Sequence, residues 1–134
     1  MPIPAPEIDE TNRWYWDGLI LGELRYQHCR QCGNSWLPPT EECSQCLFAD
    51  WEIRTASGKA TLVSWVRYHT ATHPEFKDRV PFNVAVVKLA EGPRTVTNLI
   101  DIADWDTVHA GMTLQLKIEE DDDVYLARFA LAGA

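Results

Sequence analysis

Four cysteines in two closely spaced pairs constrain this chain more than any other feature. They are the only cysteines among its 134 residues and form two Cys-x-x-Cys knuckles ten residues apart, Cys29/Cys32 and Cys43/Cys46. A two-residue spacer lets both thiolates of a knuckle reach one ion, and two such knuckles are typical of a tetrahedral zinc site. Because four protein ligands leave no open position for a substrate, the predicted zinc is structural and not catalytic.

Two other roles for the cysteines fit the sequence less well. A redox dithiol usually has one Cys-x-x-Cys after a strand, whereas this chain has two facing pairs. Disulfides require an oxidising compartment, and residues 1–6 have neither the basic nor the apolar region of a signal peptide. We therefore expect a cytoplasmic protein. No apolar run approaches the roughly 18 residues of a membrane span, so we expect no membrane association.

The pattern of apolar residues predicts a mainly β chain in three consecutive parts. Residues 1–22 hold an extended arm and a helix, residues 23–50 form a rubredoxin-like zinc ribbon, and residues 51–134 form a small barrel. The ribbon is too small to bury a core of its own, so the metal is expected to supply most of its stability.

The helix is predicted over residues 9–21, with Asp9 as its N-cap and Gly22 directly after its end. Trp16 and Leu21 widen its apolar stripe beyond what the ribbon alone could cover. Aromatic side chains serve cores and interfaces alike. The helix therefore packs against the rest of the chain or forms a protein interface.

Five strands are predicted in the barrel, after a brief strand at 51–54. They cover residues 60–69, 82–89, 95–102, 113–118 and 124–131. The first alternates in a way that places Leu62 and Trp65 on opposite faces. One long loop at 70–81 and one gap bridged by a short helical turn fit a five-stranded Greek-key barrel of the OB type.

The charge of the chain argues against a nucleic-acid ligand, although OB folds often bind one. The net charge is −8. OB folds grip nucleic acid with the loops between strands 1–2 and 4–5, and the predicted 4–5 loop, residues 119–123, consists of five consecutive carboxylates. These would repel a phosphate backbone. We therefore expect no nucleic-acid partner and keep a nucleic-acid-binding ribbon/OB protein as an alternative.

The loop between the first two barrel strands has the opposite character. Arg67, Lys77 and Arg79 are basic and lie in or beside it, and His73 and Phe76 offer flat faces. This set is sufficient for one small anionic ligand, such as a nucleotide-bearing cofactor, but not for a polymer.

No catalytic motif is present in the sequence. It lacks a Gly-x-Ser-x-Gly elbow, a Walker loop, a Gly-x-Gly-x-x-Gly turn and a His-Glu-x-x-His pair. His69 and His73 could act as general bases, but neither has a recognisable nucleophile beside it. We expect no self-contained active site.

The order of short motifs resembles that of a known family. The motifs are Gly18-Leu19-Ile20-Leu21-Gly22-Glu23-Leu24, the knuckles around Pro38-Pro39, Ser57-Gly58, Val63-Ser64-Trp65, Pro81-Phe82, Glu91-Gly92-Pro93-Arg94 and Gly111-Met112. The family consists of small bacterial and archaeal proteins that join a rubredoxin-like zinc ribbon to an OB fold, and it was long catalogued as a domain of unknown function. The resemblance covers residues 14–129. The chain departs from the family pattern at Thr40, Ser44 and Ala60, where Arg, Pro and Gly are common.

The resemblance implies a function that the residues alone do not. Members of the family typically accompany thiolase-like enzymes, either thiolases proper or the lipid-transfer-protein-type aldolases that shorten steroid side chains. They act as non-catalytic subunits that bind or pass on acyl-CoA. We therefore expect a zinc-containing accessory subunit in a hetero-oligomer, with acyl-CoA near Arg67, Lys77 and Arg79. A stand-alone acyl-CoA-binding protein is the other alternative.

Overall fold

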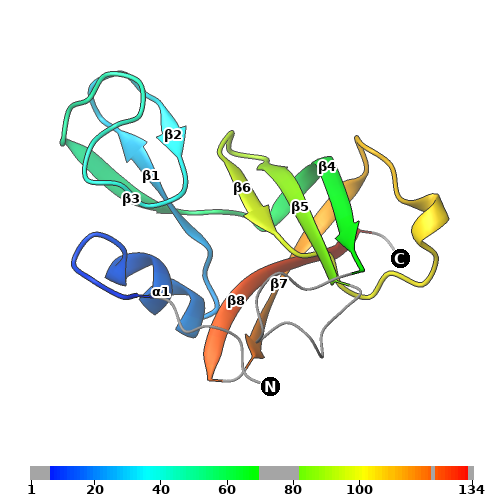
Figure 1. Cartoon of the computed structure of the whole chain (residues 1–134). Coiled ribbons are helices and arrows are strands. Elements are labelled where there is room, and N and C mark those ends of the chain that lie inside the picture. The colour runs from blue at the N-terminus through cyan, green and yellow to red at the C-terminus, as the bar shows by residue number, and fades with distance from the viewer. Residues whose placement is uncertain (1–6, 70–81, 122, 133–134) are drawn as a thin grey trace.

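The computed structural model describes residues 7–69, 82–121 and 123–132 (Figure 1). The elements are, in order, α1 (Arg13–Ile20), β1 (Arg25–Cys29), β2 (Ser35–Trp36), β3 (Trp51–Thr55), β4 (Lys59–Tyr68), β5 (Phe82–Leu89), β6 (Arg94–Thr97), a 3₁₀ turn (Trp105–Thr107), β7 (Thr113–Asp121) and β8 (Val124–Leu131). The strands form two antiparallel sheets, a three-stranded sheet in the order β2-β1-β3 and a five-stranded sheet in the order β6-β5-β4-β7-β8. Helix α1 contacts β1 of the first sheet and β8 of the second.

The helix begins later than the sequence predicts. The expectation that Asp9 caps it is wrong, because the N-cap position belongs to Asn12. The Asp9 carboxylate instead accepts hydrogen bonds from the backbone N–H groups of Thr11 and Asn12, at 2.9 and 3.2 Å. A short Asp side chain bonded to backbone two or three residues ahead closes a turn of its own. That turn precedes α1.

The predicted end of the helix is confirmed at Gly22. This residue has a φ of +85°, a conformation that glycine adopts without steric cost. The N–H of Glu23 donates to the carbonyl of Gly18 at 2.7 Å, and the N–H of Gly22 donates to the carbonyl of Leu19 at 3.1 Å. These two bonds make a Schellman motif, which stops the helix and turns the chain into β1.

The three-stranded sheet carries the knuckles and is centred on β1. Strand β3 pairs with β1 along its whole length, so the sheet extends to Thr55, beyond residue 50 where we expected the ribbon to end. Gln27 of β1 is fully buried, and its side-chain amide exchanges two hydrogen bonds with the backbone of Thr40, at 2.6 and 2.9 Å. A buried amide satisfied in this way holds the segment after Pro38-Pro39 against the sheet.

A β-bulge interrupts β4 and overturns the predicted alternation. Leu62 pairs with Val87, but the next pair is Ser64 with Val86, so Val63 is an extra residue. A bulge shifts every following side chain to the other face. Leu62 and Trp65 therefore share the inner face of the barrel.

The third barrel strand is shorter than predicted, covering Arg94–Thr97 instead of 95–102. The Asn83 side chain is the cause. Its Oδ1 accepts from the N–H of Leu99 at 2.6 Å, and its Nδ2 donates to the carbonyl of Leu99 at 2.9 Å. With both backbone groups bound by a side chain, residue 99 cannot continue the ladder with β5.

Instead, the chain after β6 crosses to β8 and helps to close the barrel. Leu99 forms a parallel bridge with Phe129. The N–H of Phe129 donates to the carbonyl of Asn98 at 3.1 Å, and the N–H of Ile100 donates to the carbonyl of Phe129 at 2.9 Å. The five-stranded sheet is thereby curled into the half-barrel expected of an OB fold.

The predicted turn of carboxylates over 119–123 is wrong as well. Strand β7 runs to Asp121 and β8 begins at Val124, so Glu119, Glu120 and Asp121 continue the strand. Arg128 of β8 explains this, because its guanidinium binds Glu119 at 3.0 Å and Asp121 at 2.7 Å. Two of the five carboxylates are thus neutralised by a partly buried cation.

One hydrophobic core joins the barrel and the helix. Its most deeply buried side chains are Leu19, Leu24, Leu62, Val87, Leu89, Leu114 and Phe129. The observed fold is mainly β, with one N-terminal helix, a four-cysteine ribbon and a five-stranded half-barrel, which confirms the predicted fold class. None of the helices in the described ranges is long and apolar enough to cross a membrane.

Candidate functional site

The four cysteines converge at one end of the three-stranded sheet. Their sulfur atoms all lie within 4.8 Å of one another. Cys29 Sγ is 3.5 Å from Cys46 Sγ, and Cys32 Sγ is 3.6 Å from Cys43 Sγ. Zn–S bonds of about 2.3 Å place the sulfurs of a tetrahedral site about 3.8 Å apart, so this arrangement fits a zinc ion. It does not fit disulfides, whose sulfurs are about 2.05 Å apart.

Backbone N–H groups favour the thiolate form of two of the four cysteines, Cys29 and Cys43. The N–H of Cys32 and that of Gln31 donate to Cys29 Sγ and lower its pKa. Burial opposes ionisation of Cys43, but N–H donors, including that of Gln45 at 3.4 Å, outweigh it and lower its pKa to about 6. Donors of this kind favour the thiolate, which is the form that binds metal.

The raised pKa of Cys46 shows why a cation belongs among the four sulfurs. The N–H of Phe48 favours the thiolate of Cys46, but burial and the neighbouring thiols outweigh it and raise its pKa to about 12. Four sulfurs at this spacing cannot all carry negative charge unless a cation lies between them. The donor set and its geometry therefore support structural zinc held by all four cysteines.

Thr40 shapes the ribbon where the family often has an Arg. Its hydroxyl accepts from the indole N–H of Trp36 at 2.8 Å and donates to the carbonyl of Glu42 at 2.7 Å. Together with the two hydrogen bonds between the Gln27 side chain and the backbone of Thr40, these bonds fix the chain between Pro39 and the second knuckle. Thr40 therefore has a structural role.

Arg67, the first of the three predicted acyl-CoA residues, lies near the end of β4. The bulge turns it to the inner face, where its guanidinium carbon is 4.7 Å from the centre of the Trp105 ring. Trp65 lies on the same face, 5.3 Å from Trp105. Arg67 forms no ion pair within the described ranges, so its charge is available to an anion.

The other members of this predicted set cannot be placed. Lys77 and Arg79 lie outside the described residues, as do His73 and Phe76. The acyl-CoA site therefore stays a prediction, anchored in the structure by Arg67 alone.

One histidine contacts a hydroxyl group. His28 Nδ1 is 2.8 Å from Ser35 Oγ, between two paired strands of the ribbon. Glu52 of β3 is the direct cross-strand partner of His28, but its carboxylate binds Arg54 at 3.0 Å. A nucleophile–base pair needs a third group that orients the base, so the contact fits a cross-strand bond better than a catalytic dyad.

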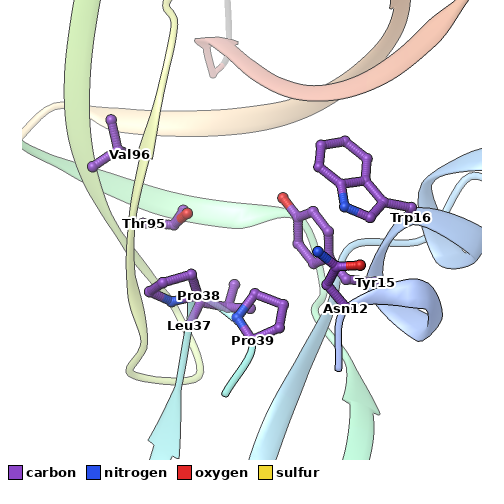
Figure 2. Close-up of a pocket in the computed structure, with 8 residues that line it drawn as sticks. All are labelled: Asn12, Tyr15, Trp16, Leu37, Pro38, Pro39, Thr95 and Val96. Carbon is purple, nitrogen blue, oxygen red and sulfur yellow. The ribbon is translucent and has the colours of Figure 1, made fainter. Parts of the chain in front are cut away.

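A groove that no sequence motif predicts lies where the helix, the ribbon and the barrel meet. It has a volume of about 390 Å³. Figure 2 shows its lining side chains between the helix and β6. It is lined by Asn12, Tyr15, Trp16, Leu37, Pro38, Pro39, Thr95 and Val96. Three segments far apart in the sequence supply these residues, which is why no local motif marks the groove.

Two aromatic side chains of α1 bring polar atoms to this groove. The Tyr15 hydroxyl points into it, and the Trp16 ring forms one side (Figure 2). Burial raises the pKa of Tyr15 to about 12. Within the described residues, neither the Tyr15 hydroxyl nor the Trp16 indole N–H makes a hydrogen bond. Trp14, in contrast, packs on the ribbon, 6.0 Å from Trp51.

Two consecutive parts of the chain match known protein families. Residues 16–52 match the family described as "ChsH2, rubredoxin-like zinc ribbon domain", and residues 54–119 match "ChsH2, C-terminal OB-fold domain". A "DUF35 domain-containing scaffold protein" of Methanothermobacter thermautotrophicus is 33% identical over 71% of this chain and 73% of its own length. The chain belongs to the ChsH2 (DUF35) family. The resemblance noted in the sequence is thus confirmed.

A longer relative and a solved structure are also similar to this ChsH2-family chain. The "Probable enoyl-CoA hydratase alpha subunit" of Thermomonospora curvata is 34% identical over 94% of this chain, which spans only 39% of that relative's length. One chain of the structure described as "Ltp2-ChsH2(DUF35) aldolase" has a TM-score of 0.83 and 33% identity. That match covers 96% of our chain and 99% of the matched one.

Proposed function

We propose that this chain is a non-catalytic accessory subunit of a thiolase-superfamily enzyme, either a thiolase or an aldolase of the steroid side-chain type. In a cytoplasmic hetero-oligomer it would help to bind or channel acyl-CoA thioesters. The observation that carries the proposal is the likeness, over 96% of this chain and 99% of the other, to a chain of the Ltp2-ChsH2(DUF35) aldolase. The name of the Methanothermobacter relative, a scaffold protein, points the same way.

The chemistry of the chain agrees with a non-catalytic role. All four thiols lie in the metal cluster, where they are not available as nucleophiles. Among the described histidines, His28 bonds to Ser35 without an orienting carboxylate, and His109 bonds to the carbonyl of Thr107 at 3.1 Å. His69 is exposed directly after β4 and has no hydrogen-bond partner among the described residues. Carbon–carbon bond cleavage or formation is therefore assigned to the partner enzyme.

Arg67 supports an acyl-CoA ligand. Its guanidinium is stacked on Trp105, which holds the charge in place, and a fixed guanidinium binds phosphate oxygens well. Lys77 and Arg79 would add positive charge from the adjoining loop, and the Trp105 and Trp65 rings offer flat apolar surface. The name of the Thermomonospora relative contains an acyl-CoA thioester, which agrees with this ligand class.

The test begins with the identity of the partner. The tagged chain is purified from its source cells, and the co-purifying subunit is identified by mass spectrometry. We expect a thiolase-like enzyme whose activity on acyl-CoA increases when the chain is added. In that complex, replacement of Lys77 and Arg79 together by Gln should raise the KM for acyl-CoA, because phosphate contacts are lost, and leave zinc content unchanged.

Three results would contradict the proposal. The first is acyl-CoA cleavage by the isolated chain that disappears in His69→Ala or His73→Ala. The second is acyl-CoA binding by the isolated chain with full affinity and no enzyme partner, which would favour the stand-alone alternative. The third is tight, salt-sensitive binding of single-stranded nucleic acid, which is typical of a phosphate-binding surface.

A further inference from the structure

The outer face of β4, β5 and β6 is mainly apolar, with Ser64 as a polar exception. In β5 the residues facing the core, Ala85, Val87 and Leu89, are buried, and the alternate positions Val84 and Val86 face outward. A strand that is apolar on both faces is typical of a sheet covered on both sides, whereas an exposed face of an antiparallel sheet is normally polar.

The strand register extends this face across all three strands. Val86 is paired with Val96 of β6, Val84 with Val66 of β4, and Phe82 with Tyr68. Directly paired residues share a face. We call these six residues the valine face: Val66, Tyr68, Phe82, Val84, Val86 and Val96. Val96 is 68% exposed, Val66 49% and Tyr68 45%, far more than core residues.

Two cations border the valine face at the end of β5 and β6. Lys88 and Arg94 are directly paired, exposed, and on the same side as Val86 and Val96. Like charges in this position repel each other, and neither forms an ion pair within residues 7–69, 82–121 and 123–132. In a chain with a net charge of −8, this basic pair is complementary to carboxylates on another molecule.

The groove continues the valine face around the free edge of β6. Val96 belongs to both surfaces, and Thr95, beside it, faces the Tyr15 hydroxyl (Figure 2). Strand β6 is an edge strand, so its outer backbone groups are also open to a neighbour. Apolar contact, free hydrogen-bond donors and a basic border therefore meet along one strand.

We propose that the valine face and the adjoining groove form the docking surface for the enzyme subunit, which presents an apolar patch bordered by carboxylates opposite Lys88 and Arg94. This inference rests on the proposed function for the identity of the subunit. A second copy docked through the same face would bring Lys88 and Arg94 of both copies into one interface, where like charges repel, so it is a poorer occupant. Large exposed apolar patches mark interaction sites in general.

The test uses the subunit that co-purifies with the tagged chain, produced recombinantly after its identification. We compare Val96→Glu with Leu47→Glu, because both replace an exposed apolar side chain, 68% and 69% exposed, and Leu47 lies in the second knuckle away from the barrel. Val96→Glu should weaken association at least tenfold, while Leu47→Glu should stay within twofold of the unaltered chain. Zinc content and thermal unfolding establish that both variants fold.

A second pair of variants tests the basic border. Lys88→Glu with Arg94→Glu should slow association and reverse its dependence on salt, because the new carboxylates would repel those of the partner. The matched control, Arg30→Glu with Arg54→Glu, reverses two exposed ribbon cations that are ion-paired within the chain. The control should leave association within twofold. Hydrogen exchange in the complex should protect β5 and β6.

The outcomes separate this inference from the proposed function. A thiolase-like subunit that binds Val96→Glu as tightly as the unaltered chain, with β5 and β6 unprotected, overturns the docking surface and leaves the function standing. A subunit of another class that protects β5 and β6 overturns the function and leaves the surface standing. Failure of any subunit to co-purify, or coverage of the face by a second copy of the chain, overturns the inference.

Discussion

The guanidinium of Arg67 is stacked on the ring of Trp105, with its central carbon 4.7 Å from the ring centre. The contact joins β4 to the 3₁₀ turn between β6 and β7, and it gives the mouth of the barrel one fixed positive charge. A cation–π interaction of this kind contributes about 0.5–1 kcal/mol of stabilisation at an exposed site.

Removing the Trp105 ring should therefore weaken acyl-CoA binding by releasing Arg67. In the complex, Trp105→Leu should raise the KM for acyl-CoA about two- to fivefold, the equivalent of the cation–π energy, with kcat nearly unchanged. Trp105→Phe keeps a ring under the guanidinium and should restore most of the affinity. Equal KM values for the unaltered chain and both Trp105 variants would show that Arg67 does not bind the ligand.

The zinc site should bind one zinc ion per chain through four sulfurs. Chelation, or the substitution Cys43→Ser, should unfold the ribbon, because closed sites of this kind contribute on the order of 10 kcal/mol of apparent folding free energy. Trp36, which is 6% exposed, and Trp51 pack against the cluster, so their fluorescence should report the loss. Iron, or a well-folded sample without metal, would contradict this prediction.

The Asn83 side chain should be essential for closing the barrel. Asn83→Ala leaves the N–H and the carbonyl of Leu99, a 3% exposed residue, without their side-chain partner. At about 1–3 kcal/mol for each unsatisfied buried group, we expect a loss of about 2–4 kcal/mol in urea unfolding. Asn83→Asp keeps the acceptor and should lose less. Ser64→Ala, on the exposed face of β4, is the control and should change stability by less than about 0.5 kcal/mol.

Tyr15 should make the fold sensitive to alkali. Burial raises its pKa from 10.0 to about 12. Between these two values the unfolded chain has lost a proton that the folded chain retains, so stability falls as the pH rises through this window. The stability lost across this whole window is on the order of 2 kcal/mol.

The variant Tyr15→Phe isolates this contribution. Its free energy of unfolding should match that of the unaltered chain at pH 8, because the hydroxyl makes no hydrogen bond within the described residues. Between pH 8 and pH 11 it should lose less stability than the unaltered chain. An identical decline in both proteins would assign the alkaline sensitivity to other groups.

The zinc site was predictable because its signal is local. Each knuckle places two ligands within four residues, and a tetrahedral ion fixes how the knuckles face each other. The strands were predictable for a similar reason, since alternation is visible in a short window. Gly22 was recognised as the end of α1 because a left-handed residue after a helix strongly favours glycine.

The errors arose where a side chain or an added residue competes with backbone periodicity. The extra residue at Val63 reverses the faces of β4, and no composition rule marks it. Asn83 ends β6 from a position on another strand. Arg128 allows the acidic residues to remain in a strand. Each of these depends on a partner distant in sequence.

The groove has no signal in the sequence, but the valine face beside it does. The run Phe82 to Val87 is apolar at nearly every position, a pattern that predicts a strand covered on both faces. The sequence does not reveal which second layer would cover it. Tyr15 and Pro38 come together with this sheet only through the packing of α1 between ribbon and barrel.

Because Pro38 and Pro39 belong to the ribbon while Thr95 and Val96 belong to the barrel, the groove has walls that are stabilised by different means. The barrel wall rests on the hydrophobic core. Leu37 of the ribbon wall joins that core, but Pro38 and Pro39 lie between the two knuckles that would hold the zinc ion. Removing the metal should therefore loosen the ribbon wall and leave the barrel wall intact. If the groove is part of the docking surface that we propose, a cell short of zinc, or under thiol oxidation, would contain a partner enzyme with an undamaged active site and an accessory subunit unable to bind it.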